Sequence, residues 1–73
     1  MANKKELQRQ IELKARVLES ARNTLDVLMS RTVQYNPGTD TYRTHYQQWS
    51  QQNDKVINLE TELQSLQKQL DML

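Results

Sequence analysis

Large side chains recur along the second half of this chain at alternating intervals of three and four residues, and this spacing constrains the fold more than any other feature. The repeating positions are Tyr42, His45, Trp49, Gln52, Val56, Leu59, Leu63, Leu66, Leu70 and Leu73. A three-four repeat places its members along one stripe of an α-helix, as in the contact seam of a coiled coil. We therefore predict a helix over about 41–72 whose apolar stripe packs against another helix.

The first half of the chain predicts a second helix. Its broad apolar face comprises Leu7, Ile11, Leu18, Ala21, Leu25, Leu28 and Met29, with Val17 at the margin. Asn3 followed by Glu6 is typical of a capping box, in which the Asn side chain accepts from the third helical amide and the Glu reaches back. The helix should therefore begin near Lys4, and we predict it over about 4–34.

The only proline and the only glycine separate the two stripes. Pro37 disfavours helical angles at the residue before it, and Gly38 can adopt a positive φ, so we predict a turn over 35–40. Thr39 or Asp40 is available to cap the second helix. A sustained period of two, the usual sign of a strand, is absent from the sequence.

A connection this short makes the two helices antiparallel neighbours. The predicted fold class is therefore all-α, with residues 1–73 forming a single antiparallel two-helix hairpin of the coiled-coil type. Charge favours the same pairing. Up to position 35 there are seven basic and four acidic residues, and beyond it three and five, so the halves attract each other.

Polar residues in the two seams would fix the register of the hairpin. Positions whose numbers sum to about 74 should lie side by side, namely Leu25 and Trp49, Leu18 and Val56, Ile11 and Leu63, and Leu7 and Leu66. Lys14 then comes opposite Glu60, and His45 and Gln52 are the other polar seam positions. A pairing shifted along the helices would lose these polar contacts and would therefore be less favourable than the correct register.

We expect the hairpin to complete its core with a partner. A chain of 73 residues buries a modest share of its surface, and the absence of cysteine excludes disulfides. Scattered exposed apolar residues are normal, but those outside the two seams widen the apolar surface beyond what one helix covers. We interpret them as a contact surface for a second copy or another protein. The predicted protein-binding residues are Leu13, Val17, Val27, Tyr42, Tyr46, Trp49, Ile57, Leu63, Leu66 and Leu70.

Aromatic residues gather around the predicted turn. Tyr35, Tyr42, Tyr46 and Trp49 are all the aromatic side chains of the Phe, Tyr and Trp types in the chain. One interpretation is a plug that closes the end of the hairpin by packing on Leu28 and Met29. The other is an interface patch, since Tyr and Trp often anchor protein contacts. Both hold if the plug is only partly covered.

Composition argues against most chemical functions. His45 is the only histidine and has no clustered ligands in the sequence, the serines and threonines lack a base at useful spacing, and a single glycine does not make a phosphate-binding loop. We expect no enzymatic activity, no metal and no cofactor. Acidic residues interleave with the basic ones, so we do not expect nucleic-acid binding. Short apolar runs argue against membrane insertion and a signal peptide, and we expect a cytoplasmic protein.

Residues 44–60, THYQQWSQQNDKVINLE, resemble a short motif of one protein family. The small co-chaperones of bacterial type III secretion needle subunits are cysteine-free helical hairpins of about this size. They often carry a Tyr-Gln-x-Trp-like stretch, then polar residues, then an apolar stripe. Tyr46, Gln47 and Trp49 stand at the matching places, followed by Val56 and Ile57 among the apolar positions.

The resemblance implies a cytoplasmic binding protein. Such a hairpin pairs with a larger helical-repeat chaperone, and together they keep a polymerising needle subunit soluble until export. The alternative from the residues alone is a self-associating coiled-coil protein, a dimer or tetramer with a structural or regulatory role, for instance in a phage or mobile element. A nucleic-acid accessory protein is the third reading.

Overall fold

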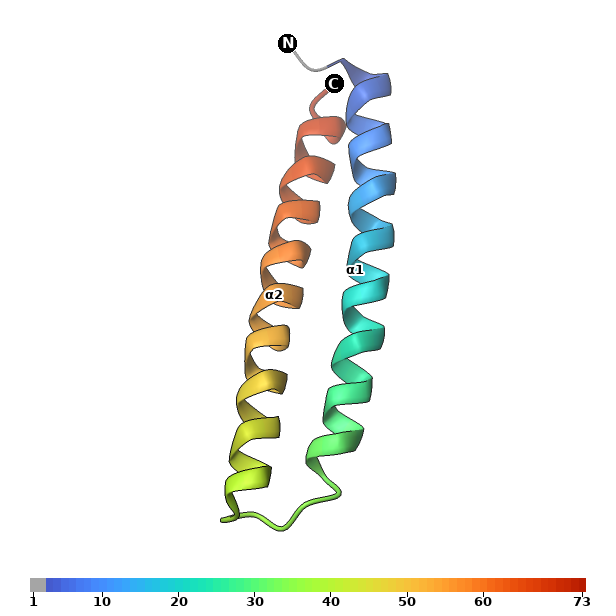
Figure 1. Cartoon of the computed structure of the whole chain (residues 1–73). Helices are drawn as coiled ribbons and strands as arrows, with labels where there is room; N and C mark the ends of the chain where they lie inside the picture. The colour runs from blue at the N-terminus through green and yellow to red at the C-terminus, as the bar shows by residue number, and fades with distance from the viewer. Residues whose placement is uncertain (1–2) are drawn as a thin grey trace.

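The structure is a hairpin of two long α-helices. This computed structural model describes residues 3–73, with α1 over Lys4–Thr32 and α2 over Asp40–Asp71. The helices run antiparallel and side by side, with the turn at one end and the two described chain ends at the other (Figure 1). Residues 3–73 contain no strand. The predicted all-α hairpin is confirmed, and positions 1 and 2 of the predicted 1–73 domain lie outside the described residues.

Side-chain caps fix where both helices begin. Asn3 Oδ1 accepts a hydrogen bond from the Glu6 amide at 2.8 Å, which is the predicted cap of α1. Thr39 Oγ1 accepts from the Tyr42 amide at 3.2 Å and caps α2. With Thr39 in the cap position, α2 begins at Asp40, one residue before the predicted start, and its last residue is Asp71 rather than position 72.

The first helix ends earlier than predicted. Beyond Thr32 the backbone tightens to bonds between residues three apart, from the Gln34 amide to the Arg31 carbonyl at 3.3 Å and from the Tyr35 amide to the Thr32 carbonyl at 3.2 Å. Such bonds satisfy the last carbonyls of an α-helix and terminate it. The α-helix therefore stops at Thr32, two residues before the predicted position 34.

A tight turn at residues 36–39 reverses the chain. The Thr39 amide donates to the Asn36 carbonyl at 3.3 Å, with Pro37 and Gly38 in the two central positions. Gly38 has a φ of 95°, the only positive φ among residues 3–73. Proline first and a positive φ second is the arrangement of a type II turn. Thr39 Oγ1 also donates to the Asn36 carbonyl at 2.8 Å, so one side chain joins the turn to the cap of α2.

Replacing Gly38 with alanine should lower the free energy of unfolding by about 1–2 kcal/mol, because a Cβ is disfavoured at this φ. Nothing lies within 4 Å of that Cβ, so the cost is backbone strain alone. Urea unfolding followed by circular dichroism measures the change. Gly38→Asn is the control and should lose less, since Asn tolerates positive φ. Equal stability of the alanine variant and the native chain would contradict this turn geometry.

The core is small, and its one cluster, Leu18, Ala21 and Val56, lies in the middle of the hairpin. Leu7, Leu18, Ala21 and Val56 are the buried apolar residues of the described chain, and Thr32 is the buried polar one. Leu18 and Val56 belong to one cluster, as the predicted register requires. The residues packed against that cluster are Leu25, Leu59 and Leu63, which are only half-buried. A molecule measuring 52 by 15 by 14 Å has no room for a deeper interior.

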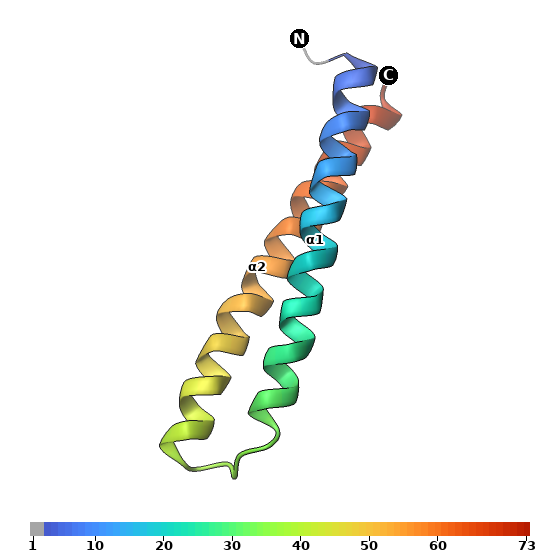
Figure 2. The same ribbon diagram turned by 45° about the vertical axis from the view of Figure 1, so that its right-hand side comes forward.

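The helices lie farther apart at the turn than at the opposite end, as both views show (Figure 1 and Figure 2). Side chains at the turn end include His45 and Trp49, which are larger than the leucines and Ala21 of the middle, and bulky contacts increase the distance between helix axes. One prediction near this end is wrong, because Met29 lies about 100° round the helix from the half-buried Leu28 and is not covered by α2. Met29, expected on the apolar face that packs against α2, is 46% exposed.

Three polar contacts among residues 3–73 cross between the helices, two ion pairs and one hydrogen bond. Lys14 Nζ lies 2.6 Å from Glu62 Oε2, so its partner is Glu62 and not the predicted Glu60. A lysine side chain is long enough to reach a residue that is not directly opposite its own Cα. Glu60 Oε1 lies instead 3.7 Å from Arg22 Nη2. Lys14 therefore still forms a polar contact that depends on the register of the two helices, but its partner is a different carboxylate.

Gln52 forms the second register contact from within the seam. Its Nε2 donates to the Ala21 carbonyl of the opposite helix at 3.0 Å, and the bond is partly buried. A side-chain donor that reaches a helix carbonyl beside the core depends on the two helices being paired as they are. The sequence predicted that Gln52 marks the register but could not identify its acceptor.

The Gln52→Glu variant should lose about 1–3 kcal/mol of unfolding free energy near neutral pH, because a carboxylate would face the Ala21 carbonyl without a donor. Lowering the pH should restore part of the loss, since a protonated carboxyl can donate as the amide does. Thermal unfolding across a pH series measures both effects. Gln51→Glu, at the exposed neighbouring position, should change stability little. Equal effects of the two substitutions would contradict the role of the Gln52 contact.

Candidate protein-binding surface

Exposed apolar side chains lie on two different sides of the hairpin. Leu13, Val17 and Val27 of α1 are about half exposed, at 51%, 49% and 49%. Tyr46 and Ile57 of α2 are exposed to a similar extent. The sequence placed all five in one predicted contact surface. Whether they form one surface depends on how each helix is turned about its axis.

The two ion pairs beside the seam indicate that the exposed apolar residues of α1 and α2 lie on different sides of the hairpin. Glu62 of α2 pairs with Lys14, and Glu60 pairs with Arg22. Two residues along a helix correspond to about 200° of rotation, so Glu60 and Glu62 point to opposite sides of the seam. Ile57 precedes Glu60 by three residues and shares its side. Glu62 instead borders the hollow that Leu13 and Val17 line. Ile57 is therefore separated from the exposed residues of α1.

The side that contains Leu13 and Val17 is hollowed. A groove of about 630 Å³ lies between the two helices there, with Leu13, Val17 and Leu66 as its apolar walls. Its polar walls are Gln10, Lys14, Glu62 and Ser65. Three of the predicted protein-binding residues thus meet in one place.

The groove continues along α1 toward the turn. Val17 is shared with a second hollow, which Arg16, Gln52 and Lys55 also line. Ser20 and Thr24 belong to that hollow and to a third. The third extends to Val27, Leu28 and Arg31. We name this row of three adjoining hollows, from Gln10 to Arg31 along α1 and bordered in part by α2, the α1 furrow.

The predicted contact residues of the α2 stripe belong mainly to the hairpin itself. Leu63 packs against the core cluster, and Leu66 and Leu70 are half-buried. Of these three, only Leu66 also lines the furrow. Tyr42 and Trp49 are half-buried as well. An apolar residue in a two-helix seam packs against the neighbouring helix and still presents one edge to solvent, because no third helix covers it.

The aromatic residues form two groups at the turn end. Tyr42, Tyr46 and Trp49 follow one another along α2, with ring centroids 6.2 Å and 5.7 Å apart in the two successive pairs. Tyr35 lies apart from them and contacts His45, at a centroid distance of 4.7 Å. Of the four residues assigned to one plug, Tyr35 therefore belongs to a separate ring pair.

Two ring nitrogens at the turn end, His45 Nδ1 and Trp49 Nε1, differ in their hydrogen bonding. His45 Nδ1 lies 2.8 Å from the Thr41 carbonyl within the same helix, so this histidine contributes to local helix structure and ring packing. Trp49 Nε1 is buried and has no hydrogen-bond acceptor among the residues the structure describes. An unpartnered buried donor carries a desolvation cost, and the packing of the indole ring must offset it.

Neither a metal-binding cluster nor a membrane-spanning helix is found among residues 3–73. Residues 3–73 contain no group of three or more His, Cys, Asp or Glu side chains arranged to hold a metal ion. Neither helix is both long enough and apolar enough to cross a membrane, as far as the described residues extend. Comparisons with models of protein families, with curated proteins and with solved structures find no significant match.

Sequence reasoning missed several members of the furrow. Four small or polar residues were not predicted as contact residues from the sequence, namely Gln10, Ser20, Thr24 and Ser65. A signal for α1 was present, because Gln10, Leu13, Val17, Ser20, Thr24, Val27 and Arg31 repeat at alternating intervals of three and four residues. This second stripe beside the seam is typical of a helix that contacts neighbours on two sides.

Proposed function

We propose that this chain is a non-enzymatic protein-binding module whose apolar surface is completed by a helical protein. The observation that carries the proposal is the contrast between its core and its surface. Four apolar residues are buried among residues 3–73, whereas ten large apolar or tyrosine side chains are exposed. A two-helix unit with this balance is poorly stabilised alone, and covering the exposed side chains would add to its stability.

The most specific form of the proposal is a co-chaperone that resembles those of type III secretion needle subunits. Support comes from the hairpin architecture, the YQQW stretch at positions 46–49 near the start of α2, and the furrow that is open to a partner. In this role the hairpin would pair with a larger helical-repeat chaperone in the cytoplasm. The two together would keep a polymerising subunit soluble.

Co-expression tests the proposal. The chain is produced with a helical-repeat chaperone and a needle subunit from the same genome, and the complex is analysed by size-exclusion chromatography with light scattering. We expect a stable complex of defined mass, and we expect the needle subunit to stay soluble only when both other proteins are present. A chain that never joins the chaperone, with a subunit that stays soluble without it, would contradict the co-chaperone role.

Self-association is the second candidate, and exposed apolar residues on two sides of the hairpin favour it. Copies could cover Leu13 and Val17 on one side or Tyr46 and Ile57 on the other. The solution mass over a wide concentration range separates the candidates. A dimer or tetramer that persists on dilution would favour self-association, whereas a monomer or a loose mixture favours a different partner.

A further inference from the structure

We propose that the α1 furrow receives a single amphipathic helix of another protein, about 20 residues long, whose polar flanks are acidic. This inference rests on the proposed protein-binding function, and it adds the partner's chemistry and the place where it binds. Tyr46, Ile57 and the aromatic residues of α2 lie outside this contact.

The shape of the furrow fits a helix. The furrow follows α1 from Gln10 to Arg31, which at 1.5 Å per residue is about 32 Å, or about 20 residues of a parallel or antiparallel helix. Its floor repeats at intervals of three and four residues, the spacing that interlocks with the side chains of another helix. The residues of this floor are Leu13, Val17, Ser20, Thr24 and Val27.

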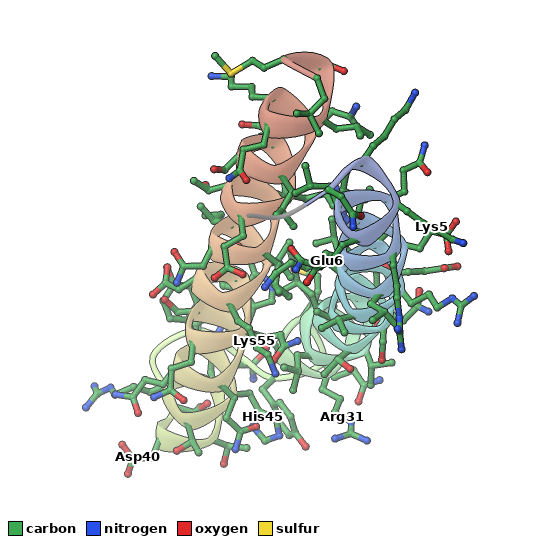
Figure 3. All side chains as sticks on the ribbon, turned by 90° about the horizontal axis from the view of Figure 1, so that it is seen from above. Lys5, Glu6, Arg31, Asp40, His45 and Lys55 are labelled. Carbon is green, nitrogen blue, oxygen red and sulfur yellow. The ribbon has the colours of Figure 1, made fainter. Side chains whose placement is uncertain are left out.

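The charge of the furrow defines the flanks of its partner. Arg16, Lys55 and Arg31 line it, and among residues 3–73 the structure shows no ion pair for any of them. Lys55 extends from α2 toward α1, while Arg31 projects from the turn end of α1 (Figure 3). The one carboxylate on the furrow, Glu62, is already paired with Lys14. Three basic side chains that form no ion pair, around an apolar floor, favour a helix with acidic flanks.

A second copy of the chain fits the furrow less well. Two furrows placed face to face would bring Arg16 and Arg31 of both copies together, and like charges across an interface are unfavourable. Three of the four acidic residues of α1 are on another side, since Val17 and Glu19 are two residues, or about 200°, apart. The acidic stripe consists of Glu12, Glu19 and Asp26, at intervals of seven. A contact between that stripe and a furrow joins unlike surfaces, so it closes only in a ring and otherwise extends without limit.

Two synthetic helical peptides serve as probes of the furrow. Both have about 21 residues and the same leucine and alanine stripe, and they differ only in flanks of glutamate or lysine. Fluorescence anisotropy of the labelled peptides measures their affinity for the full chain. We expect the glutamate peptide to bind at least about tenfold more tightly than the lysine peptide, and we expect added salt to narrow the difference.

Substitutions on α1 locate the binding site. Val17→Glu should weaken binding of the glutamate peptide by at least about tenfold, because it places a negative charge in the apolar floor. Ala15→Glu is the matched control, since it adds the same charge two residues away on an exposed side of the same helix. Combined Arg16→Glu and Arg31→Glu should reverse the preference between the peptides. Circular dichroism verifies that each variant keeps its helices.

Defined outcomes overturn the inference. These are absence of binding by both peptides, equal affinity for both, or a loss of binding in Ile57→Glu but not in Val17→Glu. A stable dimer that Val17→Glu dissociates would show that a second copy occupies the furrow. A chaperone complex that survives Val17→Glu but not Ile57→Glu would overturn the furrow as the site and leave the proposed function intact. Peptide binding without any chaperone complex would overturn the proposed co-chaperone function and leave the furrow as a binding site.

Discussion

Replacing Val56 with aspartate should abolish the folded hairpin. Val56 is 4% exposed and packs with Leu18 and Ala21 in the core cluster. A carboxylate there would lose its hydration without gaining a partner, which costs several kcal/mol. Since the chain has so small a core, we expect most of the helical circular dichroism signal to disappear at 25 °C.

The neighbouring residue provides a matched control for Val56→Asp. Ile57 is also β-branched and lies in the same helix, but it is 50% exposed. Ile57→Asp should therefore keep its helices and unfold at nearly the native temperature. If Val56→Asp remained fully helical at the native mass, the seam between α1 and α2 would be wrongly placed.

Trp49→Ala should have the second largest effect, with a loss of about 2–4 kcal/mol of unfolding free energy. The indole ring is half-buried, its Nε1 is buried, and Tyr46 contacts it at a centroid distance of 5.7 Å. Truncation to alanine removes the buried ring surface and this ring contact. Urea unfolding followed by circular dichroism measures the loss.

Trp49→Phe separates packing from hydrogen bonding at the same position. Because Trp49 Nε1 has no acceptor among the described residues, phenylalanine removes no hydrogen bond and relieves a buried donor. We expect a change of about 1 kcal/mol or less. A loss as large as that of Trp49→Ala would mean that the indole N–H makes a contact essential to the fold.

The sequence predicted the helices and their pairing because local rules determine both. The three-four spacing of α2, the Asn3 and Thr39 caps and the Pro37-Gly38 break each act over a few residues. Errors arose where the result depends on the reach and direction of single side chains. Lys14 reaches Glu62 instead of Glu60, and Met29 lies beyond the edge of the packed face, because a spacing rule determines neither side-chain reach nor the exact edge of that face.

The candidate surface was less accessible to sequence reasoning than the fold. Leu13, Val17 and Leu66 were predicted as contact residues, and the structure brings them into one groove. Ile57 lies on another side, which depends on the rotation of each helix about its own axis. The partner, the co-chaperone role and the location in the cytoplasm stay predictions that the experiments above can decide.

The small core has a consequence for the lifetime of the chain in a cell. A marginally stable hairpin exposes its backbone to proteases in proportion to its unfolded fraction, and a bound partner reduces that fraction by mass action. Unbound copies should therefore be degraded faster than bound ones. If the proposed partner is what stabilises the hairpin, the amount of this protein would follow the amount of that partner without any separate control of its synthesis.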